Sequence, residues 1–301
     1  MSRYKLFSGV ATALITPFCP DGSLDAEAFS HLVRRQVGTG VTALVTGGTT
    51  GEAPTLTDDE KNELIRIAVS EGGGLPVIAG AGSPDTSHAV KMAREAESAG
   101  ASALLTVTPY YNKTSPDGLV GYYRAVCGAT SLPVIAYVVP SRTGMGLPEE
   151  IWGELFAIPN LIGVKDAAGN LSSAARLISR LGDEVCVWSG SDELTLPYLS
   201  LGGDGVISVA SNLVPERMAE LCRAFFAGET KKAADVSARL QPLFDVLFSE
   251  VNPIPVKAAA EMAGLCSGVC RPPLVRPRAA VQRQLYRVLS GFPELDLKFP
   301  V

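Results

Sequence analysis

The sequence lacks the features that mark a nucleic-acid-binding, membrane or secreted protein. It contains no run of basic residues and its formal net charge is −5, which argues against nucleic acid or an anionic membrane as its main partner. No segment approaches the ~20 uninterrupted apolar residues of a membrane span, and residues 1–9 lack the apolar stretch of a signal peptide. We therefore expect a cytoplasmic protein that acts on small molecules.

Metal and cofactor motifs are also missing. Of the six cysteines only Cys266 and Cys270 lie close in sequence, and no second pair or nearby histidine completes a metal site. The dinucleotide fingerprint is absent, because residues 80–85 have no third glycine and carry Pro84 where a helix would hold pyrophosphate. Both histidines, His31 and His88, fall in expected helices away from strand ends. We expect free thiols, structural or solvated histidines, and neither metal nor cofactor.

What is present is one repeated unit. Short runs of Val, Ile, Leu and Ala alternate with amphipathic helical patterns, which predicts a parallel sheet. Eight repeats favour closure into a (β/α)8 TIM barrel, with a doubly wound open sheet as the alternative. The expected strands are 10–16, 42–46, 76–80, 103–107, 133–137, 161–165, 185–189 and 205–209.

The pattern then becomes purely helical. Helices are expected at 217–226, 231–248, 256–263 and 277–289, and no linker-like block separates them from the preceding repeats. We therefore expect a barrel over residues 1–229 that carries the active site, followed by a small helical region over residues 230–301.

The expected strand 161–165 ends on Lys165. In an α/β barrel the active site lies at the carboxyl ends of the strands, so a lysine there is a candidate for chemistry. A free lysine with a pKa of about 10.4 leaves roughly one amine in 2,500 neutral at pH 7. Burial beside the apolar run that precedes Lys165 would favour the neutral, nucleophilic amine. The alternative is a lysine that extends from the strand end into solvent.

Other strand ends carry groups that suit a keto acid. The loop 47–52 offers glycines and two hydroxyls, a nest of donors for a carboxylate, although it could be only a tight turn. Tyr137 ends the strand next to that of Lys165, where it could move protons. Arg142 is a forked donor fitted to a carboxylate, unless it forms a surface salt bridge. Together with Lys165 these residues suggest a Schiff base with a keto acid.

At these positions the sequence resembles the class I pyruvate aldolase superfamily, and within it the dihydrodipicolinate synthase family. The resemblance extends from about residue 7 to residue 288. It is carried, in order, by Thr16-Pro17-Phe18, Gly48-Thr49-Thr50-Gly51-Glu52, Thr108-Pro109-Tyr110-Tyr111-Asn112, Pro140-Ser141-Arg142-Thr143-Gly144, Gly163-Val164-Lys165, Gly205-Val206-Ile207-Ser208 and Asn252-Pro253-Ile254-Pro255-Val256-Lys257.

The resemblance implies a lyase of diaminopimelate and lysine biosynthesis. Such an enzyme condenses pyruvate with L-aspartate 4-semialdehyde through a lysine imine to give 4-hydroxy-tetrahydrodipicolinate. It also implies a homotetramer, a dimer of dimers, in which Tyr111 reaches a neighbouring subunit. The implied roles are imine formation by Lys165, a proton relay of Tyr137, Thr49 and Tyr111, pyruvate carboxylate binding at Thr50, Ile207 and Gly190, and semialdehyde binding by Arg142.

Two other functions stay open. A lyase or aldolase of the same superfamily could act on N-acetylneuraminate or a 2-keto-3-deoxy acid. A non-catalytic keto-acid-binding protein is disfavoured, because a sensor would need neither Lys165 nor Tyr137.

This chain also departs from the family pattern at a few positions. Val138 replaces the usual asparagine, which leaves the placement of Tyr137 open, and Asp166 replaces the commoner glutamate.

Many members are inhibited by L-lysine, but of the residues that bind it only the tyrosine is retained here. Insensitivity to L-lysine is therefore expected. The positions concerned are Tyr110, Pro84, His88, Asp58 and Lys61.

Overall fold

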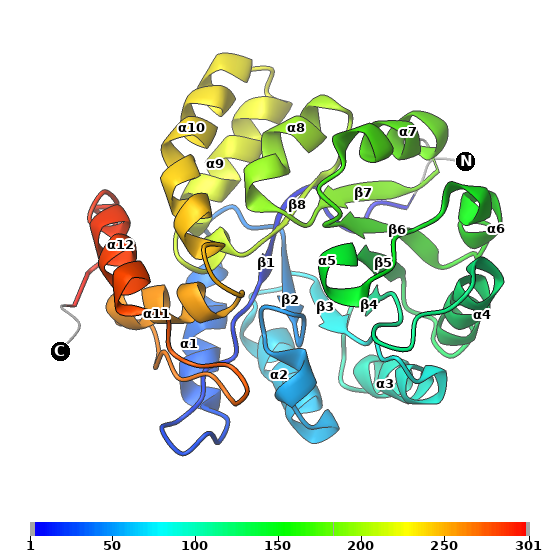
Figure 1. Cartoon of the computed structure of the whole chain (residues 1–301), viewed down its shortest axis with the longest axis horizontal. Helices are drawn as coiled ribbons and strands as arrows, with labels where there is room; N and C mark the ends of the chain where they lie inside the picture. Colours follow the sequence, from blue (N-terminus) through cyan, green and yellow to red (C-terminus); the bar gives the residue numbers. More distant parts are fainter. Residues whose placement is uncertain (1–3, 183, 299–301) are drawn as a thin grey trace.

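The computed structural model describes residues 4–182 and 184–298 and contains a closed barrel of eight parallel strands. Each strand pairs with the next, and β1 pairs with β8 to close the ring, so the TIM-barrel prediction is confirmed and the open sheet is excluded (Figure 1). The strands are β1 (Gly9–Ala13), β2 (Ala43–Thr46), β3 (Val77–Gly80), β4 (Ala103–Val107), β5 (Val134–Val138), β6 (Leu161–Asp166), β7 (Cys186–Ser189) and β8 (Gly205–Ser208).

The first strand ends three residues earlier than expected. Beyond Ala13 the backbone finds side-chain partners, since the Ile15 amide donates to Asn212 Oδ1 at 3.1 Å. The hydroxyl of Thr16 donates to the carbonyl of Gly51 at 2.8 Å. This segment therefore leaves the sheet and contacts the loop after β2, where the candidate carboxylate nest lies.

Helices surround the barrel. Side-chain N-caps begin α1, α2, α3, α4 and α7; α2, for example, has a capping box in which Thr57 and Glu60 bond each other's backbone. The α-helices are α1 (Ala26–Gln36), α2 (Asp58–Glu71), α3 (Thr86–Ser98), α4 (Pro116–Cys127), α5 (Pro140–Thr143), α6 (Trp152–Leu155), α7 (Leu171–Leu181), α8 (Thr195–Ser200), α9 (Pro215–Phe226), α10 (Thr230–Leu247), α11 (Ile254–Met262) and α12 (Ala279–Leu289). Short 3-10 helices are η1 (Ala53–Thr55), η2 (Glu149–Ile151), η3 (Asp192–Leu194) and η4 (Ala210–Asn212).

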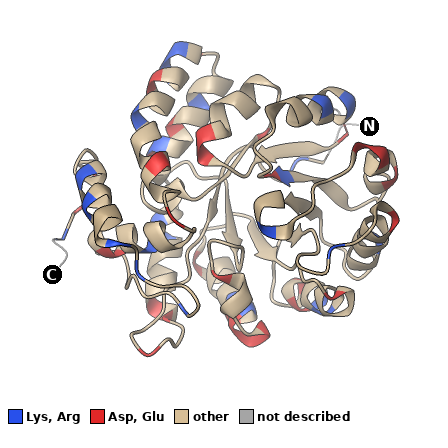
Figure 2. Cartoon of the chain, in the orientation of Figure 1, with Lys and Arg blue, Asp and Glu red and all other residues tan. Residues whose placement is uncertain are grey.

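The last four helices lie close to their predicted ranges. In Figure 1, α9 and α10 run side by side, and α12 lies beside α11 at the edge of the molecule. Charged residues sit mainly on the helices and loops, with both signs interspersed, whereas the strands are almost free of charge (Figure 2). No helix among the described residues is long and apolar enough to cross a membrane.

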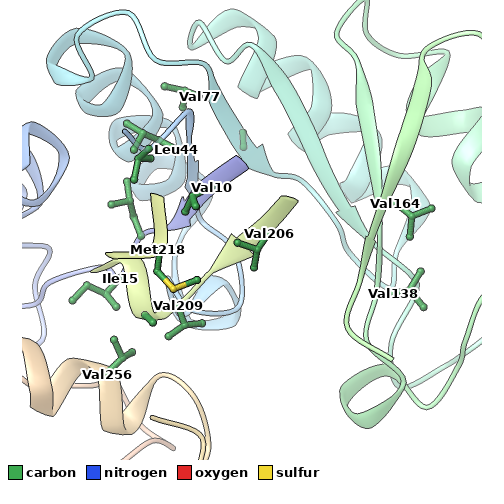
Figure 3. Close-up of a cluster of buried hydrophobic side chains, with 14 of the residues drawn as sticks. Val10, Ile15, Leu44, Val77, Val138, Val164, Val206, Val209, Met218 and Val256 are labelled. Atoms are coloured by element: carbon green, nitrogen blue, oxygen red, sulfur yellow. The ribbon is translucent and has the colours of Figure 1, made fainter. Parts of the chain in front are cut away.

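The core has two layers because side chains alternate along each strand. One cluster fills the barrel and includes Phe7 stacked on Trp188, with ring centroids 4.7 Å apart. The other lies between the barrel and the helices. Val138 and Val164, on the neighbouring strands β5 and β6, belong to this outer layer (Figure 3). Residues one position along, Tyr137 and Lys165, consequently face the barrel interior.

Candidate active site

A cavity of about 650 Å³ opens at the carboxyl ends of the barrel strands. Its wall is built by the loops after β2, β3, β4 and β5 and by the segments that flank α11. Thr49, Tyr137, Arg142 and Asn252 all line it. This is the face on which barrel enzymes carry their active sites.

Lys165 lies next to Tyr137, one of the residues that line this cavity. It is only 6% exposed, and its Nζ atom lies 4.3 Å from the centroid of the Tyr137 ring. The register of β5 and β6 places the two residues directly opposite each other. Burial lowers the pKa of the Lys165 amine; the nearby Arg142 cation acts in the same direction, while Tyr137 and Asp192 act against it. The alternative, a lysine that extends from the strand end into solvent, is therefore not observed, and the environment favours a neutral amine.

The loop after β2 brings two threonines to the same region. The hydroxyl of Thr49 donates to the phenol oxygen of Tyr137 at 3.5 Å. Thr50 is buried, and its hydroxyl oxygen accepts a hydrogen bond from Asn252 Nδ2 at 3.0 Å. Tyr111, in contrast, is 95% exposed. Within one chain the structure therefore unites Thr49, Tyr137 and Lys165 but leaves Tyr111 pointing into solvent.

The other predicted substrate-binding residues lie around the same strand ends. Arg142, in α5, has an exposed side chain whose Nη2 donates to the backbone carbonyl of Asn252 at 2.8 Å. It makes no ion pair to a carboxylate among the described residues, so the surface-salt-bridge alternative is not observed. Ile207 is buried inside the barrel on β8, and the amide of Gly190, after β7, donates to the carbonyl of Asp166 at 2.7 Å.

Both departures from the family pattern point away from Lys165. Val138 packs in the outer layer. The carboxylate of Asp166 accepts hydrogen bonds from the Tyr198 hydroxyl at 2.9 Å and from the Ala168 amide at 2.8 Å, and its burial raises its pKa. Val138 therefore lies in a different packing layer from the Tyr137 ring, which belongs to the cluster inside the barrel.

Three residues near the cavity were not assigned to the site from the sequence. His88, in the first turn of α3, lines the cavity, with Nε2 3.0 Å from Asp58 Oδ1. Asp192 is fully buried, accepts the amides of Val209 and Ala210, and has a pKa raised by burial to about 6. Asn252 lines the cavity and its amide donates to Thr50. Neither helical nor strand periodicity in the sequence indicates any of these contacts.

A closed barrel has a cavity at its strand ends, and a buried amine without a bonded carboxylate among the described residues lies against Tyr137 of the cavity wall. This arrangement defines an α/β-barrel enzyme of the imine-forming kind. The chain belongs to the dihydrodipicolinate synthetase family, whose model matches residues 6–291. The described part of the chain contains no group of three or more His, Cys, Asp or Glu side chains that could hold a metal ion.

Individual relatives agree over nearly the whole length. A 4-hydroxy-tetrahydrodipicolinate synthase from Maridesulfovibrio salexigens is 46% identical over 287 residues, covering 95% of this chain and 98% of that protein. The crystal structure of dihydrodipicolinate synthase from Aquifex aeolicus is 39% identical with a TM-score of 0.94, covering 97% of this chain and all of the other. A structure described as the first monomeric variant of dihydrodipicolinate synthase is 42% identical with a TM-score of 0.91, covering 95% and 96% of the two chains.

Proposed function

We propose that this chain is the lyase 4-hydroxy-tetrahydrodipicolinate synthase, which condenses pyruvate with L-aspartate 4-semialdehyde in lysine biosynthesis. The observation that carries the proposal is the buried amine of Lys165 beside the Tyr137 ring, in a chain of this family. A neutral amine is the form that attacks a carbonyl, and burial lowers the pKa of this one.

The first half-reaction follows from these groups. The Lys165 amine adds to the ketone carbon of pyruvate and water leaves, which forms an imine. The protonated imine withdraws electrons from the neighbouring methyl group, so that a proton can be removed from it to give a nucleophilic enamine. We propose that Tyr137, Thr49 and Tyr111 carry the protons, and that Thr50, Ile207 and Gly190 bind the pyruvate carboxylate.

The second half-reaction uses the aldehyde. The enamine carbon attacks the aldehyde of L-aspartate 4-semialdehyde, whose carboxylate we assign to Arg142. The amino group of the same substrate then attacks the imine carbon, closes the ring and releases Lys165. The guanidinium of Arg142 suits this assignment because it lines the cavity and has no carboxylate partner among the described residues.

Substrate choice is tested by turnover with pyruvate and a series of aldehydes. We expect L-aspartate 4-semialdehyde to give by far the highest kcat/KM. A preference for N-acetylmannosamine or a simple glyceraldehyde would instead indicate a sugar-acid aldolase of the same superfamily. Pyruvate binding without turnover of any aldehyde would indicate a keto-acid-binding protein.

We further propose that the chain works as a homotetramer in which Tyr111 completes the proton relay of a neighbouring subunit. A tyrosine that relays protons must contact its partners. The side chain of Tyr111 is 95% exposed within one chain, so its partners would have to come from another subunit. Tyr111→Phe should slow turnover, and mixing it with Lys165→Ala subunits should restore part of the activity. Absence of recovery after confirmed subunit exchange would contradict a shared site. The cytoplasmic location stays a prediction.

A further inference from the structure

Asn252 lies where the barrel loops meet the C-terminal helices. Its side chain is only 9% exposed, and it follows α10 by a few residues and precedes α11. Its amide Nδ2 donates to Thr50 Oγ1 at 3.0 Å, while its backbone carbonyl accepts from Arg142 Nη2 at 2.8 Å. One residue therefore contacts the two side chains that we assign to the two substrate carboxylates.

The direction of the bond to Thr50 matters. A hydroxyl has a single proton and two lone pairs, so it can accept from one neighbour and donate to another. Because Asn252 donates to the oxygen of Thr50, the hydroxyl proton remains available. No described residue accepts that proton. A carboxylate accepts hydrogen bonds only, so a hydroxyl held in this way is prepared to bind one.

Both partners of this bond are held firmly. Two residues beyond Thr50, the carboxylate of Glu52 forms a fully buried ion pair with Lys257 of α11, with N and O 2.5 Å apart. The other oxygen of Glu52 accepts the backbone amide of Arg271 at 2.9 Å. The start of α11 is thereby joined to the loop that carries Thr50, and the position of Asn252 relative to Thr50 is determined by these contacts.

The amide of Asn252 also carries a cost. Its Oδ1 atom is buried and has no hydrogen-bond partner among the described residues. An unpaired buried acceptor destabilises a fold, and an apolar side chain at this position would avoid that cost. A polar group retained under these conditions is better explained by its effect on Thr50 than by stability.

We propose that Asn252 is a positioning residue for the keto acid, which orients the Thr50 hydroxyl so that its proton faces the substrate carboxylate. The inference rests on the proposed function and adds to it that the C-terminal helical region completes the pyruvate site. Asn252 itself acts through Thr50 rather than on the reacting atoms.

Two substitutions at Asn252 test the proposal by steady-state kinetics. Asn252→Ala removes the donor and lets the Thr50 hydroxyl rotate, so the KM for pyruvate should rise by about tenfold. The KM for the semialdehyde should change little, because Arg142 bonds a backbone carbonyl that every variant keeps. Asn252→Asp should be worse at neutral pH, since a carboxylate would accept the hydroxyl proton and repel the substrate.

The aspartate variant has a signature that a merely structural role would not produce. A protonated carboxyl can donate to Thr50 as the amide does, so the ratio of its pyruvate KM to that of the unmodified enzyme should fall as pH is lowered. The ratio cancels the titration of Lys165 and Asp192, which are present in both proteins. The charged neighbours of this site, Arg142 and the Glu52–Lys257 pair, are likewise the same in both. For Asn252→Ala, the ratio of its pyruvate KM to that of the unmodified enzyme should not fall as pH is lowered.

A matched control is Asn160→Ala. Asn160 precedes β6 at the opposite end of the barrel, where Nδ2 donates to the carbonyls of Cys127, Thr130 and Leu132. Its loss should lower Tm without raising the pyruvate KM, which separates destabilisation from positioning.

Several outcomes would overturn the inference. These are an unchanged pyruvate KM in both Asn252 variants, an equal rise for both substrates in Asn252→Ala, no pH-dependent recovery in Asn252→Asp, or failure of both variants to fold. Failure of the proposed function itself is distinguishable, because the unmodified enzyme would then not turn over pyruvate with the semialdehyde at all.

Discussion

Two buried lysines in this structure each lie over an aromatic ring but have different charged partners. Lys165 and Lys257 each place Nζ 4.3 Å from the centroid of an aromatic ring, that of Tyr137 and that of Phe18 respectively. Lys257 is completely buried and pairs with the carboxylate of Glu52. Lys165 makes no ion pair with a carboxylate among the described residues, and the charged group that lowers its pKa further is a cation, Arg142.

Under the proposed function, one fold uses the same side chain for structure at Lys257 and for chemistry at Lys165. A buried ammonium with a bonded carboxylate holds two parts of the chain together, and removing either partner leaves an uncompensated charge. A buried amine without one is driven towards its neutral form, which is a nucleophile. The account therefore predicts opposite consequences for the two lysines.

The largest effect is expected for Lys165→Met. Methionine has a similar length and no amine, so turnover should fall by a factor of at least about 1,000. Stability should be unchanged or higher, because a desolvated amine is replaced by an apolar group. Activity assays and thermal unfolding measure the two quantities. Substantial residual turnover would exclude Lys165 as the nucleophile.

Lys257→Met should show the reverse pattern. It leaves the Glu52 carboxylate buried without its cation, which should cost about 3–5 kcal/mol of unfolding free energy in urea titrations. Adding Glu52→Gln to the same chain should recover part of the loss, since the uncompensated charge is then removed. A loss below about 1 kcal/mol would mean that the pair does not hold α11 to the barrel loop.

Arg142→Ala sharpens the contrast by removing the cation near Lys165. The semialdehyde should lose about 2–4 kcal/mol of transition-state stabilisation in kcat/KM, as expected for a lost charge-assisted pair. Imine formation with pyruvate should suffer much less. Equal damage to both half-reactions would show that Arg142 serves mainly to hold Asn252.

The smallest effect concerns free L-lysine, whose ammonium groups need a carboxylate as Lys257 does. In the outer part of the cavity Asp58 lies 3.0 Å from His88 and 2.6 Å from Lys91, and the Lys91 bond holds the pKa of Asp58 below its usual value. This anion is already engaged, so we expect no inhibition by millimolar L-lysine. Half-inhibition below about 1 mM, a binding free energy near −4 kcal/mol, would refute this expectation.

The features that could be predicted from the sequence are those that depend on local hydrophobic periodicity and on which end of a strand a residue occupies. All eight strands could be located, with β4 at its observed bounds, because buried parallel strands are short apolar runs between helices. The proximity of Lys165 and Tyr137 followed from their places at the ends of consecutive strands. The expected range of β1 was too long at its C-terminal end. There the Ile15 amide bonds the side chain of Asn212, which is 197 residues away.

Contacts made by the C-terminal region could not be predicted. Glu52 and Lys257 each belong to a recognisable motif, but their pairing spans 205 residues, and that of Thr50 with Asn252 spans 202. Such pairs depend on how the last helices pack on the barrel, which no local pattern encodes. The position of His88 was wrong for a different reason: it falls in the first turn of α3 and therefore stays close to the cavity.

The most direct test of the central claim is to reduce the enzyme with borohydride in the presence of pyruvate and to map the modified lysine by peptide mass spectrometry. The account predicts one reduced pyruvyl group per chain, on Lys165, and none on Lys257. Modification of Lys257 or of a surface lysine in place of Lys165, or no adduct at all, would contradict it.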